Sequence, residues 1–345
     1  MPKGVYRLPE IKNEPVLSYA PGTHERETLK KTLAELNKGG LDIPMIIDGK
    51  EVRTNNTKEI RPPHNHKHLL GVYHQGDKSN VEMAIAAALK AKPAWEAMNW
   101  ESRAAIFLKA ADLIAGPYRA QFNAVTMIGQ SKNAHQAEID AVCELVDFYR
   151  YNVKNMHEIY SIQPNSSPGV WNRMVWRPLE GFIFALSPFN FTSIAGNLGA
   201  APALMGNTVV WKPSKTAVYS APLIMKVLME AGLPDGVINL VYVGGREATD
   251  VIFNHRDLAG LHFTGSTGVF NSMWKTIGAN ISNYKSYPRI VGETGGKDYI
   301  FACESADSKE VATAITRGAF EYQGQKCSAA SRAYIPENLW DEVKQ

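Results

Sequence analysis

Cysteine is scarce in this sequence, and long apolar runs and targeting segments are absent from it. The 345 residues include 3 cysteines, Cys143, Cys303 and Cys327, which are too few and too scattered for a disulfide framework, so we expect a reducing compartment. No apolar run approaches the length of a membrane span, so no membrane partner is predicted. The first residues contain neither the apolar core of a signal peptide nor an Arg- and Ser-rich presequence. The protein is expected either to stay where it is made or to have lost a targeting peptide.

Charge of one sign is not concentrated anywhere in the chain. Lys and Arg number 37 and Asp and Glu 34, with the two signs interspersed, which excludes a basic nucleic-acid arm and predicts no nucleic-acid partner. His64, His66 and His68 alternate in a short run, but no Cys or carboxylate stands at ligand spacing. This pattern favours a solvated loop, and no metal site is predicted.

The first part of the chain is predicted to consist of helices joined to short strands. Hydrophobic residues make up 45% of the sequence, enough for a core and for two domains. A hairpin is expected over 44–53, turning at Asp48-Gly49, and a polar hairpin over 161–177 is typical of an assembly edge. The capping box Ser79–Glu82 predicts the start of one helix. Further helices are expected over 24–38, 101–115, 119–128 and 133–158.

One predicted helix carries an acidic stripe. Asp140, Glu144, Asp147 and Tyr151 share one side of the helix over 133–158. Their spacing alone predicts a solvated face.

From Gly181 onward, strands and helices alternate. This alternation predicts right-handed crossovers and a fold of the α/β class, a doubly wound parallel sheet of the Rossmann-like type. A new α/β unit is predicted to begin after Glu293. Strands are expected over 182–186, 207–212, 237–241, 260–264 and 288–291, and then over 298–302 and 332–336.

Ligands of such sheets bind where the strands end, and the sequence becomes polar or glycine-rich there. The three stretches are Ser187–Asn190, Lys212–Ser214 and Gly265-Ser266. The Gly265-Ser266 turn suits a pyrophosphate at a helix N-terminus, although an ordinary turn is an equal alternative. Lys212 can reach a ribose or phosphate, or be a surface lysine. Asn190 can donate to an oxyanion, or form a turn.

Cys327 is the candidate nucleophile. It follows the flexible approach Gly324-Gln325-Lys326, and Glu293 lies well before it in a Gly-rich turn. A thiol and a separate carboxylate suit covalent catalysis with a general base. A lone cysteine without an adjacent histidine is more often a small buried hydrophobe. An activated Cys327 is expected to be alkylated faster than the other two cysteines near neutral pH.

The order Asn190, Lys212, Gly265-Ser266, Glu293 and Cys327 resembles the aldehyde dehydrogenase superfamily over almost the whole chain. The detail is most similar to the Δ1-pyrroline-5-carboxylate (glutamate-γ-semialdehyde) dehydrogenase branch. The supporting stretches are Ala137–Arg150, Ser187–Thr192, Pro202–Ser214 and Phe320–Ala329.

The resemblance implies NAD-dependent oxidation of L-glutamate γ-semialdehyde to L-glutamate, in proline catabolism. Cys327 would form the thiohemiacetal and then the thioester, Asn190 and the Cys327 N–H would hold the oxyanion, and Glu293 would activate water. The resemblance also implies contacts with cofactor and substrate. The cofactor residues would be Ser187, Lys212, Ser214, Gly265 and Ser266, and the substrate residues Glu144, Phe191 and Ser328. For Glu144 this replaces the solvated-face prediction.

Two departures from the family pattern bear on these expectations. Lys215 stands where many NAD-preferring relatives carry an acidic residue, so tolerance of NADP is expected beside NAD binding. The chain ends at Gln345, before elements that the family places after the nucleophile, so we expect a truncated chain with little turnover alone. The alternatives are an inactive fragment that retains dinucleotide or partner binding, and a dehydrogenase for another aldehyde.

The resemblance also predicts organisation and assembly. The expected parts are an N-terminal helical and strand part (1–160), an oligomerisation hairpin (161–178), a Rossmann-like NAD-binding core (179–293) and the start of a catalytic domain (294–345). The expected partners are a small-molecule aldehyde and a second copy of the chain, in a homodimer or higher homo-oligomer. The expected location is the mitochondrial matrix, or otherwise the cytoplasm.

Overall fold

The computed structural model describes residues 8–345, which form two compact units. The larger unit runs as far as Thr264 and resumes over Met273–Gly292. The smaller unit consists of Gly265–Ser272 and Glu293–Gln345. Within residues 8–345, no helix combines the length and the apolar character that a bilayer crossing requires.

The larger unit is built on a twisted sheet in which the central strands run parallel. The strand order is β10-β9-β6-β7-β8-β2-β3. The pairs β6–β7, β6–β9 and β7–β8 are parallel, which confirms the predicted doubly wound sheet. The strands are β2 (Met45–Ile47), β3 (Lys50–Val52), β6 (Phe182–Leu186), β7 (Thr208–Lys212), β8 (Ile238–Leu240), β9 (Leu258–Thr264) and β10 (Arg289–Glu293).

The chain reverses its direction across this sheet at β6. From β6 it winds outward through β7 to β8, and it then returns to place β9 on the other side of β6. Doubly wound sheets bind ligands beyond the carboxyl ends of the strands at such a reversal point. The sheet therefore places a candidate site beyond the ends of β6, β7 and β9.

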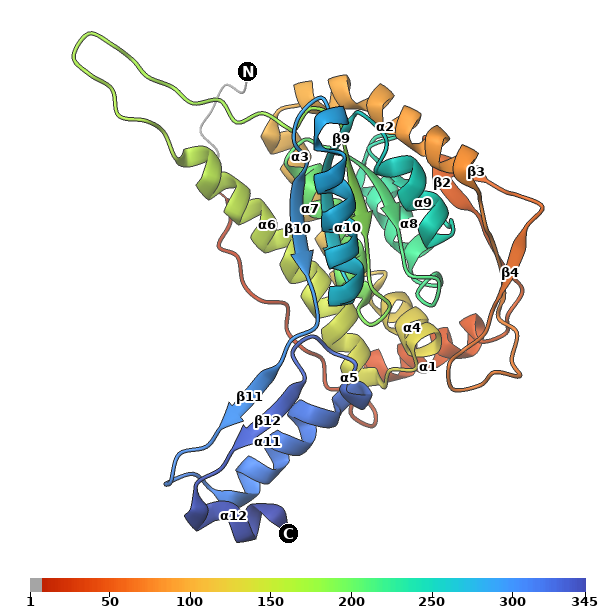
Figure 1. The fold of residues 1–345 in the computed structure, drawn as a ribbon. Coiled ribbons are helices and arrows are strands. Elements are labelled where there is room, and N and C mark those ends of the chain that lie inside the picture. The colour runs from red at the N-terminus through yellow and green to blue at the C-terminus, as the bar shows by residue number, and fades with distance from the viewer. Residues whose placement is uncertain (1–7) are drawn as a thin grey trace. The chain divides into compact units, whose positions relative to one another are not determined.

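Helices cover both faces of this sheet (Figure 1). α2 (Lys78–Ala97) packs across β6, β7 and β8, and α7 (Thr192–Leu204) packs against β6, β7 and β9. Strands covered on both faces need continuous apolar runs, and Phe182, Ile183 and Phe184 are accordingly all buried. The chain also forms the helices α3 (Trp100–Ala115), α6 (Glu144–Ser161), α8 (Ala221–Ala231), α9 (Gly245–Ile252) and α10 (Thr267–Ala279).

A second, three-stranded sheet precedes α2 in the chain. It has the order β1-β5-β4, in which β1 (Leu41–Ile43) runs parallel to β5 (Gly71–His74) and β4 (Thr57–Ile60) runs antiparallel to it. Near it, α1 (His24–Leu36) packs against α4 (Arg119–Gln130). The predicted hairpin at Asp48-Gly49 is confirmed by the antiparallel β2–β3 pair. Both turn residues have positive φ, 52° and 72°, as the twist of a two-residue hairpin turn requires.

The helix predicted over 133–158 is interrupted. It begins as α5 (Ala134–Ala137), passes through a π-helical turn at Glu138–Cys143 and continues as α6. A π-helical turn frequently marks a functional position, because it shifts the facing of the residues that follow. The sequence periodicity did not predict this shift.

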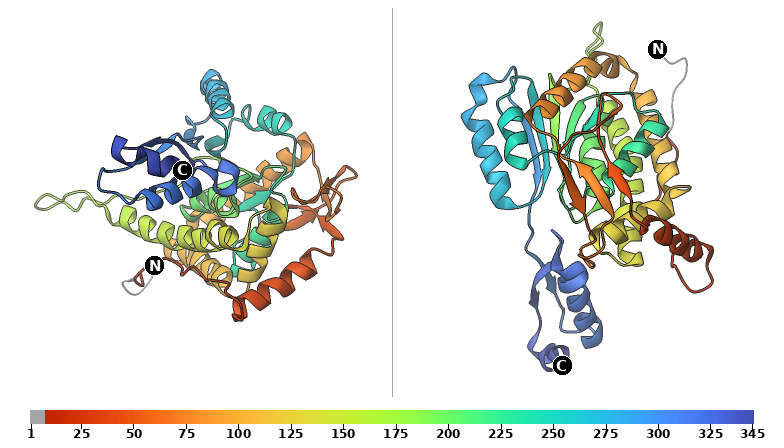
Figure 2. Two further views of the ribbon diagram at one scale, coloured as in Figure 1. Left: turned by 90° about the horizontal axis from the view of Figure 1, so that it is seen from below. Right: turned by 90° about the vertical axis from the view of Figure 1, so that its right-hand side faces the viewer.

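The hairpin predicted over 161–177 does not form strands. The segment extends away from the helices as a long loop, as Figures 1 and 2 both show. Its two arms are joined through the Gln163 side chain, which accepts from the Met174 N–H (2.9 Å) and donates to the Met174 carbonyl (3.3 Å). A two-stranded ribbon with nothing packed on it is only marginally stable in water, which accounts for the missing ladder.

The smaller unit is a compact β-α-β arrangement. β11 (Asp298–Phe301) pairs in parallel with β12 (Ala330–Tyr334), and α11 (Ser308–Phe320) makes the crossover between them. A last helix, α12 (Glu337–Lys344), packs on α11. Both predicted strands are present, although β12 begins two residues earlier than predicted.

The capping box predicted for α2 is wrong in its residues. The N-cap is Asp77, whose carboxylate accepts from the Ser79 N–H (2.8 Å), while the Asn80 side chain accepts from the Asp77 N–H (3.0 Å). Glu82 is exposed. An aspartate is as good an N-cap as a serine, and its carboxylate also favours the helix dipole.

We predict that Asp77→Ala lowers the free energy of unfolding by about 1 kcal/mol, because α2 then loses its cap. Urea denaturation followed by circular dichroism measures the change as a lower midpoint. Glu82→Ala is the control and should leave the midpoint unchanged. A larger loss for Glu82→Ala than for Asp77→Ala would contradict the assignment of the cap.

Candidate active site

In the smaller unit, Glu293 and Cys327 both lie just before the start of a parallel strand. β11 begins at Asp298, shortly after Glu293, and β12 begins at Ala330, shortly after Cys327. Asp298 and Ala330 are partners in the ladder. Because parallel partners start at the same edge, the strand pair brings the two approaching segments together.

At Gly296 the first of these segments passes close to the second. A Cβ atom on Gly296 would lie 2.1 Å from the carbonyl oxygen of Cys327. Only glycine fits there, whereas a Cβ on the neighbouring Gly295 would meet nothing within 4 Å. The glycines of the 292–296 turn therefore differ in role, and Gly296 sets the distance to the nucleophile loop.

The segment before Cys327 has a strained backbone. Tyr322 (φ 52°), Gln323 (φ 55°) and Gly324 (φ 69°) are all left-handed, which is unusual for the first two. Tyr322 is buried, and the Gln325 N–H donates to its carbonyl (3.0 Å). Strain of this kind is found where a structure fixes a functional group, and here it fixes the approach to the thiol.

The Cys327 thiol donates a hydrogen bond to the Glu293 carboxylate. Burial, followed by this hydrogen bond and by the negative charge of Glu293, raises the pKa of Cys327 to about 11. The N–H groups of Ser328 and Cys327 act in the opposite direction, because they stabilise the thiolate. A raised pKa favours the protonated thiol at neutral pH, and the faster alkylation expected of Cys327 stays a prediction. The carboxylate is instead placed to accept the thiol proton.

The Gly265-Ser266 turn contacts the Glu293 backbone. The Gly265 N–H donates to the Glu293 carbonyl (3.1 Å). Ser266 begins α10, because its carbonyl accepts from the Phe270 N–H (3.0 Å) and its hydroxyl accepts from the Val269 N–H (3.4 Å). The predicted strand-to-helix turn is therefore present, with the helix N-terminus immediately after Ser266.

In the larger unit, the ends of β6 and β7 bring Ser187, Lys212 and Ser214 together. The Ser187 N–H donates to the Lys212 carbonyl (3.2 Å), and the Ser214 N–H donates to the Ser187 carbonyl (3.1 Å). The Ser187 hydroxyl is buried and accepts from the Trp211 indole N–H (3.0 Å). Ser187 thus holds the two strand ends together, and its contact with a cofactor stays a prediction.

Glu144, Asn190 and Phe191 also lie beyond the end of β6. Glu144 begins α6 and accepts from the Ser193 hydroxyl (2.5 Å), and Ser193 follows Phe191 in the first turn of α7. This contact joins Glu144 to the loop that carries Asn190. Glu144 is half-buried, so the solvated-face prediction is wrong for it.

A buried lysine that the sequence did not single out supports this loop. The Lys132 ammonium donates to the backbone carbonyl of Asn190 and to Asp140 (2.7 Å), and it lies 4.2 Å from the centre of the Phe191 ring. Lys132 and Asp140 are both buried, so the solvated-face prediction is also wrong for Asp140. Because these two opposite charges are buried as a pair, they hold the loop that carries Asn190 in place.

Asp147, another residue of the acidic stripe, is also hydrogen-bonded to a distant part of the chain. The Asp147 carboxylate accepts from the Asn13 side chain and from the Glu14 N–H, both at 2.7 Å. These contacts come from a segment more than 130 positions earlier, which no local periodicity can predict.

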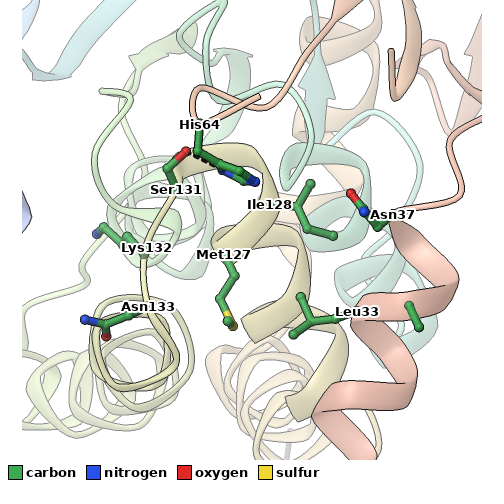
Figure 3. Close-up of a pocket in the computed structure, with 9 residues that line it drawn as sticks. Leu33, Asn37, His64, Met127, Ile128, Ser131, Lys132 and Asn133 are labelled. Atoms are coloured by element: carbon green, nitrogen blue, oxygen red, sulfur yellow. Dashed lines mark hydrogen bonds between the residues drawn. The ribbon is translucent and has the colours of Figure 1, made fainter. Parts of the chain in front are cut away.

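A pocket of about 530 Å³ is lined in part by Lys132. Figure 3 shows α1 and α4 on either side of it, with His64 bonded to Ser131 at its rim (2.8 Å). None of the predicted site residues lines it. Its lining residues are Leu33, Ala34, Asn37, His64, Met127, Ile128, Ser131, Lys132 and Asn133.

The predicted residues thus form a set in each unit. The larger unit holds Glu144, Ser187, Asn190, Phe191, Lys212 and Ser214. The smaller unit holds Gly265, Ser266, Glu293, Cys327 and Ser328, of which Ser328 is exposed beside the thiol. Sequence reasoning missed Lys132, Asp140, Ser193 and Gly296. Of these, Gly296 carried a signal, because it stands in a pair of glycines after Glu293.

Comparison with known proteins relates the chain to one family. A family model described as "Aldehyde dehydrogenase family" matches residues 51–345. An Agaricus bisporus protein named Delta-1-pyrroline-5-carboxylate dehydrogenase is 52% identical over 338 residues, which are 97% of this chain and 62% of that protein. The human protein of the same name, termed mitochondrial, is 45% identical over 336 residues, which are 97% of this chain and 60% of that protein.

Solved structures give the same relationship. The Delta-pyrroline-5-carboxylate dehydrogenase from Mycobacterium tuberculosis, crystallised with NAD, matches with a TM-score of 0.96 and 50% identity, over 99% of this chain and 64% of that one. The 1-pyrroline-5-carboxylate dehydrogenase from Thermus, with bound NAD, matches with a TM-score of 0.90 and 28% identity, over 98% of this chain and 66% of that one. The chain spans less than two thirds of the length of the curated relatives above.

We predict that Glu293→Gln makes Cys327 react faster with iodoacetamide at pH 8, because the variant loses the charge that raises the thiol pKa. The gain is about tenfold for each unit by which the pKa falls. Peptide mass spectrometry measures the rate for each cysteine. Glu310→Gln, an exposed residue of the same unit, is the control. An unchanged or slower Cys327 in Glu293→Gln would contradict the described contact.

We predict that Gly296→Ala displaces the Cys327 loop, because the new Cβ would collide with the Cys327 carbonyl. Trypsin should then cleave after Lys326 several-fold faster than in the unchanged chain. Gly295→Ala is the matched control and should leave the rate unchanged. Equal cleavage of the two variants would show that the close approach does not hold the loop.

Proposed function

The chain belongs to the aldehyde dehydrogenase family, and from this membership we propose that it carries the nucleophile and the cofactor-binding sheet of an L-glutamate γ-semialdehyde dehydrogenase. The reaction oxidises the semialdehyde, which forms from Δ1-pyrroline-5-carboxylate, to L-glutamate in proline catabolism. The observation that carries the proposal is the hydrogen bond between Cys327 and Glu293, which pairs a candidate nucleophile with a candidate base. The relatives at 52% and 50% identity, which are named for this activity, support the choice of substrate.

NAD is the proposed cofactor, and the residues present fit it. The sheet reverses between β6 and β9, and α10 begins directly after the Gly265-Ser266 turn, where backbone N–H groups suit a pyrophosphate. Lys212 and Ser214 at the end of β7 would hold the adenosine ribose. When bound, NAD supplies the nicotinamide ring that accepts hydride from the substrate carbon. The structure solved with NAD at 50% identity supports this assignment.

In the first step, Glu293 takes the proton of the Cys327 thiol while the sulfur attacks the aldehyde carbon. The new bond forms between sulfur and carbon, and the carbonyl oxygen becomes an oxyanion. The Cys327 N–H, which already stabilises negative charge on the sulfur, would donate to this oxygen. We assign a second donor role to the Asn190 amide, as its motif implies.

After Glu293 has released the first proton to solvent, it takes a proton from water in the last step as the water oxygen attacks the thioester carbon. The carbon–sulfur bond breaks, and the thiolate leaves with L-glutamate as the product. The base must not be the nucleophile itself, and Glu293 meets this requirement. We assign Glu144, Phe191 and Ser328 to the substrate, with the Glu144 carboxylate facing its ammonium group.

We also infer a homo-oligomer in which the exposed loop over 162–177 makes contacts between copies. Its Trp171 is 84% exposed and its Val175 79% exposed, which is unusual for large apolar side chains. For the location we propose the mitochondrial matrix. The human relative that is termed mitochondrial supports this assignment.

We predict that Glu293→Gln accumulates an acyl-enzyme when it is given NAD and L-glutamate γ-semialdehyde, because the thioester then lacks its base. Intact mass spectrometry should find one glutamyl adduct per chain on Cys327, with one equivalent of NADH. Cys327→Ala is the control and should form neither. A short aliphatic aldehyde, tested in parallel, should react much more slowly.

Three outcomes would overturn parts of this proposal. An adduct on another residue would exclude Cys327 as the nucleophile. A faster reaction with the aliphatic aldehyde would replace the substrate. Binding of NAD without NADH formation in any variant would favour the alternative, an inactive fragment that retains dinucleotide binding.

A further inference from the structure

Four consecutive residues at the start of α7 are each contacted by a side chain from the segment between α4 and α6. Asn190 and Phe191 precede the helix, and Thr192 and Ser193 form its first turn. Phe191, Thr192 and Ser193 are buried, and Asn190 is half-buried. The loop that carries the proposed oxyanion donor is therefore placed by an earlier part of the chain.

The first turn of α7 is held by α4 and α6. Thr126 and Gln130 stand four positions apart, so they lie on one face of α4, and both are buried. The Thr126 hydroxyl is hydrogen-bonded to the Thr192 hydroxyl (2.8 Å), and the Gln130 amide donates to that same hydroxyl (3.0 Å). The Ser193 hydroxyl donates to Glu144 (2.5 Å). These contacts hold α7 through its side chains, and the backbone of the preceding loop has a separate contact.

Lys132 makes the contact with the loop backbone. Ser131 has a left-handed backbone (φ 58°), which ends α4 and turns the chain at this point. The buried Lys132 ammonium that follows donates to the Asn190 carbonyl and to Asp140 (2.7 Å), a buried residue of the π-helical turn. It also lies 4.2 Å from the centre of the Phe191 ring. Moving this ammonium would separate a buried pair of charges, so it is a rigid support for the carbonyl.

The position of the Asn190 carbonyl also determines the position of the Asn190 amide. Both groups are attached to one Cα atom, so a carbonyl held in place restricts the rotation of the backbone that would swing the side chain away. An oxyanion donor acts only when it lies within hydrogen-bond distance of the oxygen on which charge develops. A displacement of about 1 Å can lower the rate about a hundredfold. A residue that fixes the carbonyl therefore has a large effect on the rate without touching the substrate.

We propose that Lys132 is a positioning residue, which holds the Asn190 amide where the oxyanion forms. Asp140 orients its ammonium. This inference rests on the proposed function, in which Asn190 donates to the oxyanion, and it goes beyond that function by naming the residue that sets the place of the amide. Lys132 acts through Asn190, so its removal should lower the rate of the chemical step and leave substrate binding nearly unchanged.

The rate of the first NADH formation tests the proposal in the full chain, given NAD and L-glutamate γ-semialdehyde. Lys132→Met should lower this rate about a hundredfold and leave the aldehyde concentration at half-maximal rate nearly unchanged. The same substitution in Asn190→Ala should cause no further loss, because the amide that it displaces is already absent. Lys109→Met is the matched control. The exposed Lys109 ammonium also donates to a backbone carbonyl, that of Glu230 (3.1 Å), and its loss should leave the rate unchanged.

A second variant separates positioning from stability. Lys132→Met alone leaves Asp140 buried without its partner and can unfold the chain, whereas Lys132→Met combined with Asp140→Leu replaces the pair by apolar side chains, a change that is often neutral for stability. We expect this double variant to have the urea midpoint of the unchanged chain and still the low rate, because the Asn190 carbonyl lacks its donor. Hydrogen exchange of the peptide over 187–194 should be faster in the double variant and unchanged in Lys109→Met.

The possible results distinguish this inference from the function on which it rests. If the unchanged chain forms no NADH, the proposed function fails and the inference falls with it. If the unchanged chain forms NADH, the function stands, and the inference is refuted by a further loss in the Asn190→Ala background or by recovery of the rate together with stability in the double variant. An Asn190→Ala variant as fast as the unchanged chain would also refute it. Unchanged hydrogen exchange over 187–194 would refute it without reference to activity.

Discussion

The hydrogen bond from the Cys327 thiol to the Glu293 carboxylate is the interaction on which the proposed chemistry depends. It exists because β11 and β12 are parallel neighbours, so that the chain enters both strands at the same edge. Gly296 accompanies it, because the absence of a side chain there lets the turn after Glu293 pass close to the Cys327 carbonyl. The carboxylate raises the thiol pKa, and it also gives the proton a destination when the sulfur attacks. The same contact therefore favours the protonated form of the resting thiol and provides the base for its reaction.

The larger unit solves a different problem, which is to hold flexible loops at fixed positions beyond the ends of strands. It does so with buried polar contacts. Lys132 is paired with Asp140 and donates to the Asn190 carbonyl, and Ser187 joins the ends of β6 and β7. Such contacts are costly to break, because each leaves a buried polar group without its partner. The end of β7 is the exception, since the Lys212 side chain is half-buried there with no counter-ion among residues 8–345.

Most of the sheet could be predicted because each strand is recognisable from its own residues. The run Phe182–Leu186 is apolar throughout, as a strand covered on both faces must be, and β7 and β9 follow the same rule. What failed depends on distant partners. Asp140 looks solvent-facing until Lys132 approaches it from the end of α4, and the role of Gly296 requires the ladder of the smaller unit. The arms at 162–177 are β-leaning in sequence, yet they form no ladder because nothing packs on them. The resemblance to a family supplied Glu144, which spacing alone had misassigned.

The ionisation of Cys327 in the unchanged chain is the most direct test of this account. Protein labelled with ¹³C at the cysteine Cβ gives a resonance whose shift follows thiol ionisation, and Cys327→Ser identifies the signal. Titration with pH should give a midpoint of about 11 for Cys327. A midpoint at or below about 8.5, the ordinary value for a cysteine, would contradict the contact with Glu293.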